Sequence, residues 1–186
     1  MNSGDLPGWL RVPIGEIAEL NPRQYSVEPK ESDLVSFVPM AAVETLSGRM
    51  DPSQQRAWRD VRSGFVRFQN GDVLFAKITP CMENGKFAVA KALVGGRAAG
   101  STEFHVLRPL GGMDPAYLLY FLLQESVRRD AKARMQGAAG QLRVPKQYLA
   151  ELEIPLAPLA EQCRIVVAIE EHLSRLDAAV AGLKRV

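Results

Sequence analysis

The feature that most constrains the fold of this sequence is a heptad repeat near its C-terminus. Apolar residues recur every seven positions in two registers that are interrupted once, by Gln162. The apolar positions are Leu159, Val166, Ile169, Leu173, Leu176, Val180 and Leu183. A seam of more than three heptads predicts a helix that packs along its whole length against another helix. At ~1.5 Å of rise per residue, this helix would be a rod roughly 39 Å long.

The partner of this helix is not evident within the sequence. The pattern is also compatible with the last amphipathic helix of a globular domain. The rest of the chain, however, has no second helical pattern of similar length with a matching seam. The partner helix is therefore expected from a second chain or from sequence beyond Val186, and the pattern predicts association.

Length and composition favour one domain with an appendage. The 186 residues are 47% hydrophobic, which is enough for a real core. We expect an α+β fold, with a single mixed α/β domain over residues 1–154 and a long coiled-coil-like helical segment over residues 155–186. The sequence has no run of about 18 apolar residues, so it predicts no membrane-spanning helix. No secretory signal is visible, and Cys81 and Cys163 lie far apart without other metal ligands nearby, which favours a reducing cytoplasm.

The charge of the chain is unevenly distributed. The net charge is +2, but residues 1–48 carry three basic and seven acidic residues, residues 49–150 carry sixteen and eight, and residues 151–186 carry four and six. The middle of the chain therefore holds all of the excess positive charge. A basic body between acidic ends indicates a surface that faces a polyanion.

An arginine-rich segment, residues 45–63, lies within this basic part. Arg56, Arg59 and Arg62 surround Trp58 in a polar context that is typical of a surface excursion. Two interpretations remain open. The segment is either a solvated loop or a phosphate-contacting loop whose aromatic ring reaches a base or sugar.

Two further loops concentrate polar side chains. Strand-like runs are expected at 34–40, 65–68, 72–76, 86–93 and 102–108, and Asp114-Pro115 predicts the start of a helix. The loop at 77–85 follows one of these strands, and the glycine-flanked loop at 136–143 follows the helix. For the first loop, a turn that only maintains the fold is an equally open interpretation.

Catalytic motifs are missing from the sequence. The glycines of Gly95–Thr102 resemble a phosphate-binding loop, but Ser101 stands where the essential lysine would be. His105 and His172 have no Cys, Asp or Glu at zinc-ligand spacing. No methyltransferase motif is present. We therefore expect a non-catalytic binding protein with no metal or cofactor of its own.

Several stretches resemble the specificity subunit of type I restriction-modification systems. They are Gly15–Ile17, Gly71–Lys86, Ser101–Phe104, Gly140–Val144 and Ile154–Val166, so the resemblance covers nearly the whole chain. It implies a target-recognition domain followed by a spacer helix. A full member has two such units in tandem, with antiparallel helices, and each unit reads one half of a bipartite DNA site.

The resemblance also implies the partners. They would be double-stranded DNA, modification subunits that methylate adenine with S-adenosylmethionine, and a restriction subunit that cuts; S-adenosylmethionine, ATP and Mg would belong to these partner subunits. The sequence holds one unit only, so it would be a natural half-subunit or the N-terminal half of a longer protein. Two bodies held apart by paired rods of roughly 39 Å would contact DNA about one helical turn apart.

The favoured hypothesis is sequence-specific recognition of duplex DNA. Phosphate contacts are expected from Arg56, Arg59, Arg62, Lys77 and Lys86, and base reading is expected from Asn84, Gln136, Gln141 and Arg143. The alternative is a non-catalytic protein-interaction adaptor whose helix is a dimerisation rod. Steep salt dependence of DNA binding would favour the first hypothesis.

Overall fold

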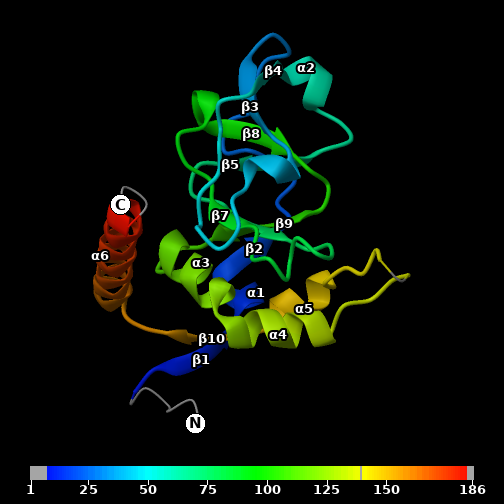
Figure 1. The fold of residues 1–186 in the computed structure, drawn as a ribbon. Helices are drawn as coiled ribbons and strands as arrows, with labels where there is room; N and C mark the ends of the chain where they lie inside the picture. The colour runs from blue at the N-terminus through cyan, green and yellow to red at the C-terminus, as the bar shows by residue number, and fades with distance from the viewer. Residues whose placement is uncertain (1–7, 139, 184–186) are drawn as a thin grey trace.

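The structure, a computed structural model, describes residues 8–138 and 140–183. Two four-stranded sheets form the body, short helices lie at one end of it, and the long helix α6 (Leu159–Leu183) runs along one side (Figure 1). This arrangement is the α+β fold expected from the sequence. It places the two sheets between the helical end and the arginine-rich segment.

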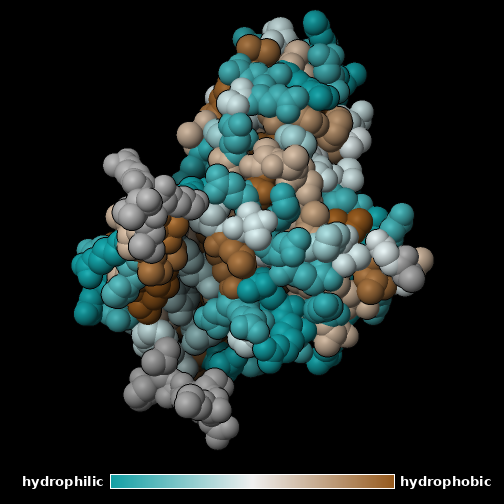
Figure 2. Space-filling model, viewed as in Figure 1, coloured by the Kyte–Doolittle hydropathy of each residue, from teal (hydrophilic) through white to brown (hydrophobic). Residues whose placement is uncertain are grey.

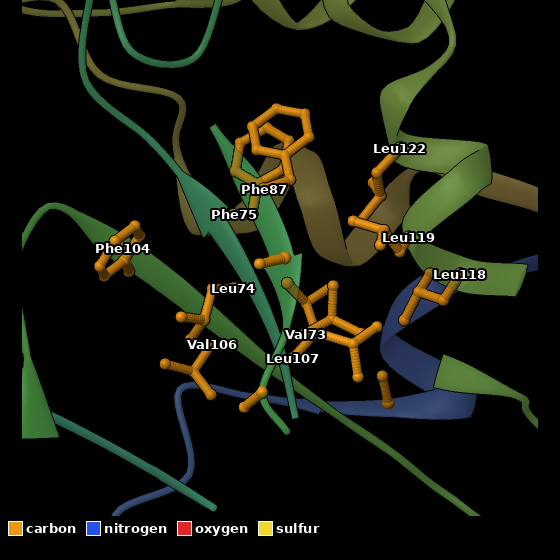
Figure 3. Close-up of a cluster of buried hydrophobic side chains, with 14 of the residues drawn as sticks. Val73, Leu74, Phe75, Phe87, Phe104, Val106, Leu107, Leu118, Leu119 and Leu122 are labelled. Carbon is orange, nitrogen blue, oxygen red and sulfur yellow. The ribbon is translucent and has the colours of Figure 1, made fainter. Parts of the chain in front are cut away.

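The sheet nearer the helices has the order β2-β9-β6-β7. Its antiparallel strands are β2 (Ala18–Leu20), β9 (Phe104–Pro109), β6 (Val73–Ala76) and β7 (Phe87–Val89). All four residues of β6 are buried, and α3 (Pro115–Leu123) covers one of the two faces of this sheet. Figure 3 shows Leu118, Leu119 and Leu122 of α3 directed at these strands, beside the stacked rings of Phe75 and Phe87.

The N-terminus of α3 follows directly from its sequence. The side chain of Asp114 accepts hydrogen bonds from the backbone N–H groups of Ala116 and Tyr117, at 2.8 and 2.9 Å, and Pro115 occupies the first helical turn. Helix α3 ends at Leu123, before the basic segment at residues 128–134. Gln124 is extended, with ψ 138°, so the chain turns there into a second helix, α4 (Glu125–Ala133).

The second sheet has the order β4-β3-β8-β5. It contains β3 (Leu34–Val38), β4 (Gln55–Ala57), β5 (Val66–Gln69) and β8 (Arg97–Gly100), and only the β3–β8 pair is parallel. The short helix α2 (Trp58–Val61) follows β4. The arginine-rich segment is therefore partly regular structure and not simply a loop.

Trp58 belongs to the core of this second sheet. Its side chain is 5% exposed and packs with Tyr25, Val35, Phe37 and Val61. The interpretation that this ring reaches a base or sugar is therefore wrong. The three arginines around it stay on the surface because the hydrophobic indole is drawn into the core and the charged groups are not.

A buried ion pair joins the two sheets. Arg108 of β9 donates to both carboxylate oxygens of Asp72, at 2.9 Å each, and Asp72 is 1% exposed. The backbone N–H of Gln69, in β5, donates to the same carboxylate at 2.8 Å. Strands from both sheets therefore bind the Asp72 carboxylate, and these bonds fix the position of one sheet relative to the other.

The helical end of the body contains three short helices and a two-stranded ribbon. The helices are α1 (Ile14–Ile17), α4 and α5 (Lys146–Glu151), and two 3-10 turns, η1 (Met40–Ala42) and η2 (Val94–Gly96), lie elsewhere in the chain. Helix α1 ends at Ile17, because the next three residues form β2. The ribbon pairs β1 (Leu10–Pro13) with β10 (Glu153–Leu156).

Helix α6 confirms the expected long helix, and the apolar side chains of its first half pack against the body, whereas its second half is joined to the body by an ion pair of 3.6 Å between Asp177 and Arg49. Gln162 is 0% exposed, Val166 is 9% exposed, and Ile169 is half-buried. Further along, Leu173, Leu176 and Val180 are 41%, 61% and 49% exposed, and Figure 2 shows an apolar stripe on this helix. Leu159 is also exposed, and the side chain of Leu183 lies outside the described residues.

Candidate nucleic-acid interface

Residues 136–138 and 140–143 belong to a hairpin that projects from the body (Figure 1). The backbones of Gln136 and Arg143 exchange two hydrogen bonds, of 2.9 and 2.8 Å. Gly137 has φ +131°, and a Cβ there would lie 2.8 Å from the carbonyl oxygen of Gln141, so glycine is required. The side chains of Gln136 and Gln141 are exposed.

The root of this hairpin is joined to the body through Arg143. Its backbone also pairs with Ile78, and the N–H of Thr79 donates to the carbonyl of Leu142 at 3.0 Å. Its guanidinium forms two hydrogen bonds to the carboxylate of Glu103, at 2.9 and 2.8 Å, and a third to the carbonyl of Gln141, at 3.0 Å. The hairpin is therefore held on both its backbone and side-chain sides.

This ion pair changes the role expected of Arg143. The donors that would grip a guanine are already engaged by Glu103, so base reading by Arg143 would require this ion pair to break. The hydrogen bonds from Arg143 hold the pKa of the Glu103 carboxyl below its usual range. Partial burial lowers the pKa of the neighbouring Lys77 ammonium group, against the opposing effect of Glu103. Four of the predicted DNA-contact residues therefore lie together at the hairpin and its root: Lys77, Gln136, Gln141 and Arg143.

The loop at 77–86 is held mainly by contacts within the protein. Met82 is fully buried, and Arg128 donates to the carbonyl of Glu83 at 2.6 Å. Lys86 donates to the carbonyls of Met40 and Val43, at 3.3 and 2.9 Å, which leaves one of its three donors for another partner. The interpretation of this loop as a fold-maintaining turn therefore has direct support. The side chain of Asn84 is exposed on it.

The three arginines of the 45–63 segment form a separate surface. The guanidinium carbon of Arg56 lies 3.8 Å from the centroid of the Phe37 ring. Nε of Arg59 lies 3.7 Å from Oδ1 of Asp60, and Nη1 of Arg62 lies 2.7 Å from Oε1 of Glu31. All three are exposed. They lie near β4 and α2, at the end of the body away from the hairpin (Figure 1). The structure therefore does not bring the predicted phosphate contacts and the predicted base-reading residues into one cluster.

His105 is a buried polar residue for which the sequence predicted no role. It is 5% exposed, its Nε2 donates to the carbonyl of Val144 at 2.8 Å, and its Nδ1 lies 3.2 Å from the amide nitrogen of Asn21. Because a carbonyl can only accept, the proton is on Nε2 and Nδ1 accepts from Asn21. Burial lowers the pKa of this imidazole. Its partners are 39 and 84 residues away, so no local pattern could have identified them.

The described residues offer little for metal or membrane chemistry. Within residues 8–138 and 140–183, no three His, Cys, Asp or Glu side chains gather as metal ligands would. Across the same ranges, no helix has the length and hydropathy needed to cross a membrane. Cys81 and Cys163 are both free thiols.

Known proteins with this arrangement are DNA specificity subunits. The family model described as type I restriction modification DNA specificity domain matches residues 7–183. The chain is 37% identical over 175 residues to the type I restriction enzyme EcoAI specificity subunit of Escherichia coli, covering 93% of this chain and 29% of that protein. It is 36% identical over 164 residues to the EcoEI specificity subunit of the same species, covering 87% of this chain and 27% of that protein.

A solved structure shares the fold. The HsdS subunit of Thermoanaerobacter tengcongensis superposes with a TM-score of 0.72 at 24% identity, over 96% of this chain and 46% of that one. The two chains therefore share a fold. The chain belongs to the type I restriction modification DNA specificity domain family. This confirms the family and fold class expected from the sequence. The chain spans less than a third of the length of these curated relatives.

Proposed function

We propose that this chain is one target-recognition unit of a type I restriction-modification specificity subunit, which reads one half of a bipartite duplex DNA target. The chain performs no catalysis itself. Modification subunits with S-adenosylmethionine and a restriction subunit with ATP and Mg supply the chemistry. The observation that carries this proposal is the hairpin at 136–143, which projects two exposed amides from a firmly held root.

The amides suit base reading. A glutamine can donate to N7 and accept from N6 of adenine in the major groove, and such a bidentate contact discriminates by about 1–3 kcal/mol. The rigid root supports this role, because a loop that is already ordered loses less conformational entropy on binding. We therefore assign base reading first to Gln136 and Gln141, with Asn84 as a further candidate and Arg143 as the residue that positions the hairpin.

The arginine surface suits the DNA backbone. Arg59 and Arg62 pair with exposed carboxylates, and exposed ion pairs of this kind contribute only about 0–1 kcal/mol, so phosphates can replace these partners at little cost. Arg56 is held over Phe37 with its outer edge exposed. Lys77 is a candidate beside the hairpin, whereas Lys86 is largely used within the protein.

The second half of α6 suits pairing with another helix. Its exposed stripe of Leu173, Leu176 and Val180 continues the seam that Val166 and Ile169 begin against the body. The pairing helix would come from a second recognition unit or a second copy of the chain, and residues 155–186 would act as a spacer separate from a domain at 1–154. Self-association would make the DNA target symmetric.

The decisive test is selection from a randomised duplex library by the specificity subunit that contains this unit, assembled with its modification subunits. We expect Gln141→Ala to relax preference at a single base position of one half-site. The matched control is Gln54→Ala, an exposed amide near the arginine surface, which should leave base preference unchanged. Retention of full preference by a Gln136→Ala, Gln141→Ala double variant would refute base reading by the hairpin.

Salt titration distinguishes recognition from the adaptor hypothesis. Phosphate contacts make log affinity fall with log salt by about 0.9 per contact. If the assembled wild-type subunit retained no duplex even at low salt, the adaptor function would be favoured.

A further inference from the structure

A hollow of about 860 Å³ on the described surface lies apart from the hairpin and from the arginine surface. One wall is the segment of residues 21–26 that follows β2, and the other is the exposed side of α5. The charged and amide side chains that line it are Glu19, Asn21, Arg23, Gln24, Arg108, Lys146 and Gln147. We refer to this hollow as the Arg23–Lys146 cleft.

The first wall is held by its backbone and by the side chain of Asn21, which leaves the side chains of Arg23 and Gln24 available. Arg67 donates to the carbonyl of Arg23 at 3.3 Å, and Arg108 donates to the carbonyl of Gln24 at 2.8 Å. Asn21 adopts φ +56°, and its side-chain oxygen accepts from the N–H of Val106 at 2.9 Å. The segment is therefore fixed by strands of both sheets, and it presents the exposed side chains of Arg23 and Gln24 to solvent.

The second wall is equally fixed. Leu149 of α5 is fully buried, and Gly15 of α1 approaches so closely that a Cβ there would lie 3.1 Å from the carbonyl oxygen of Ala150. Lys146 and Gln147 remain exposed on the opposite side of this short helix. His105 connects the two walls, because its ring bonds Asn21 at the start of one and Val144 just before the other.

The electrostatics of the cleft favour an anion. Among the described residues, neither Arg23 nor Lys146 has a carboxylate within ion-pair distance, whereas Arg108 is already neutralised by Asp72. Glu19 is the one carboxylate among the lining residues, and it is exposed. Two unpaired cations on fixed walls, with the exposed amide of Gln24 beside them, match the needs of phosphate oxygens. A concave shape concentrates their field.

We propose that the Arg23–Lys146 cleft binds the phosphodiester backbone of the duplex just outside the bases that the 136–143 hairpin reads. The inference rests on the proposed function. The chain leaves the hairpin at Arg143 and reaches the cleft wall three residues later, at Lys146, so one strand of a duplex lying against the hairpin passes the cleft. Contacts there fix register and orientation without reading sequence.

The test uses the assembled specificity subunit with Arg23→Gln, Lys146→Gln and the double variant. The control is Lys91→Gln, an exposed lysine just beyond β7, which is the opposite edge of the sheet from β2. Affinity for target and scrambled duplexes is measured across a salt series. Each cleft substitution should lower the salt slope by about 1 and weaken binding by about five- to tenfold near 0.1 M salt, on both duplexes alike.

Three outcomes decide the question. Equal losses on both duplexes, with base preference retained and with Lys146→Arg restoring the slope, support the cleft. Target binding by the double variant that matches both wild type and Lys91→Gln overturns the cleft and leaves the proposed function intact. Absence of any duplex binding by the wild-type assembly at low salt overturns both.

Discussion

Arg143 and Glu103, 40 residues apart, form a two-pronged ion pair, with Nε–Oε2 and Nη2–Oε1 distances of 2.9 and 2.8 Å. The pair connects the hairpin to the turn that precedes β9. Since both side chains are partly exposed, at 40% and 26%, its contribution lies more in geometry than in stability. A base-reading loop benefits from this geometry because its amides are held in place before binding.

Glu103→Gln should therefore loosen the hairpin without unfolding the body. We expect a change of no more than about 1 kcal/mol in the free energy of unfolding. Amide hydrogen exchange over residues 136–143 should be faster, and base preference should weaken at every position that the hairpin reads. Glu125→Gln, which removes a more exposed ion pair with Arg129, is the matched control and should change neither measurement. Unchanged exchange in the hairpin would rule out the positioning role.

Gln162→Leu should destabilise the chain strongly. The buried amide accepts from the N–H of Asp114 at 2.8 Å and donates to the carbonyls of Gly112 and Ala157 at 2.9 and 2.8 Å. Leucine would leave these backbone groups unpaired, at a cost of about 2–4 kcal/mol in total. Urea unfolding measures this cost, and Cys163→Ala, at the next and exposed position, should change stability little. A leucine variant as stable as wild type would mean that water replaces the amide.

Leu176→Asp tests the exposed stripe of α6. Leu176 is 61% exposed, so the charge should leave the thermal stability of the isolated unit nearly unchanged. It should prevent association, because an aspartate in a helix-pairing seam buries an unpaired charge. Sedimentation equilibrium compares it with Val167→Asp, which places the same charge on a 54% exposed position outside the seam. Wild-type association by Leu176→Asp would exclude this face.

Because His105 is buried, we expect the free energy of unfolding to decrease in mild acid. Burial lowers its pKa below the ordinary value of 6.5, so the unfolded chain binds the proton more readily than the folded one. Stability is full above pH 6.5 and falls as the pH decreases from there through the pKa of the folded state. Unfolding free energies at pH 8 and pH 5 measure this effect. His105→Gln should reduce the difference, whereas His172→Gln, exposed on α6, should preserve it.

The sequence predicted features that depend on neighbours along the chain. The heptad seam identified α6, Asp114-Pro115 identified the start of α3, and the glycines around 136–143 identified an exposed polar loop. Those signals arise within a few residues, so a single sequence contains them.

The roles that the sequence did not predict depend on contacts between residues that are far apart along the chain. Arginines on either side of Trp58 suggested a solvated segment, yet the indole fills a core that residues 25–99 build together. Gln162 looked like an interruption of the seam, whereas its partners lie 48 and 50 residues earlier and make it the anchor of α6. Arg143 could not be separated from a base-reading arginine until Glu103 was placed beside it.

The β1–β10 ribbon brings the two ends of the body to one place, immediately before α6 begins. The chain between residues 14 and 152 leaves this ribbon, forms the body and returns to the ribbon. Loops of the body that do not contact α6 can therefore diverge without changing the direction of the helix, which the bonds of Gln162 to Gly112 and Asp114 also help to fix. Under the proposed function, changes in those loops alter the target sequence, whereas α6 sets the spacing between half-sites.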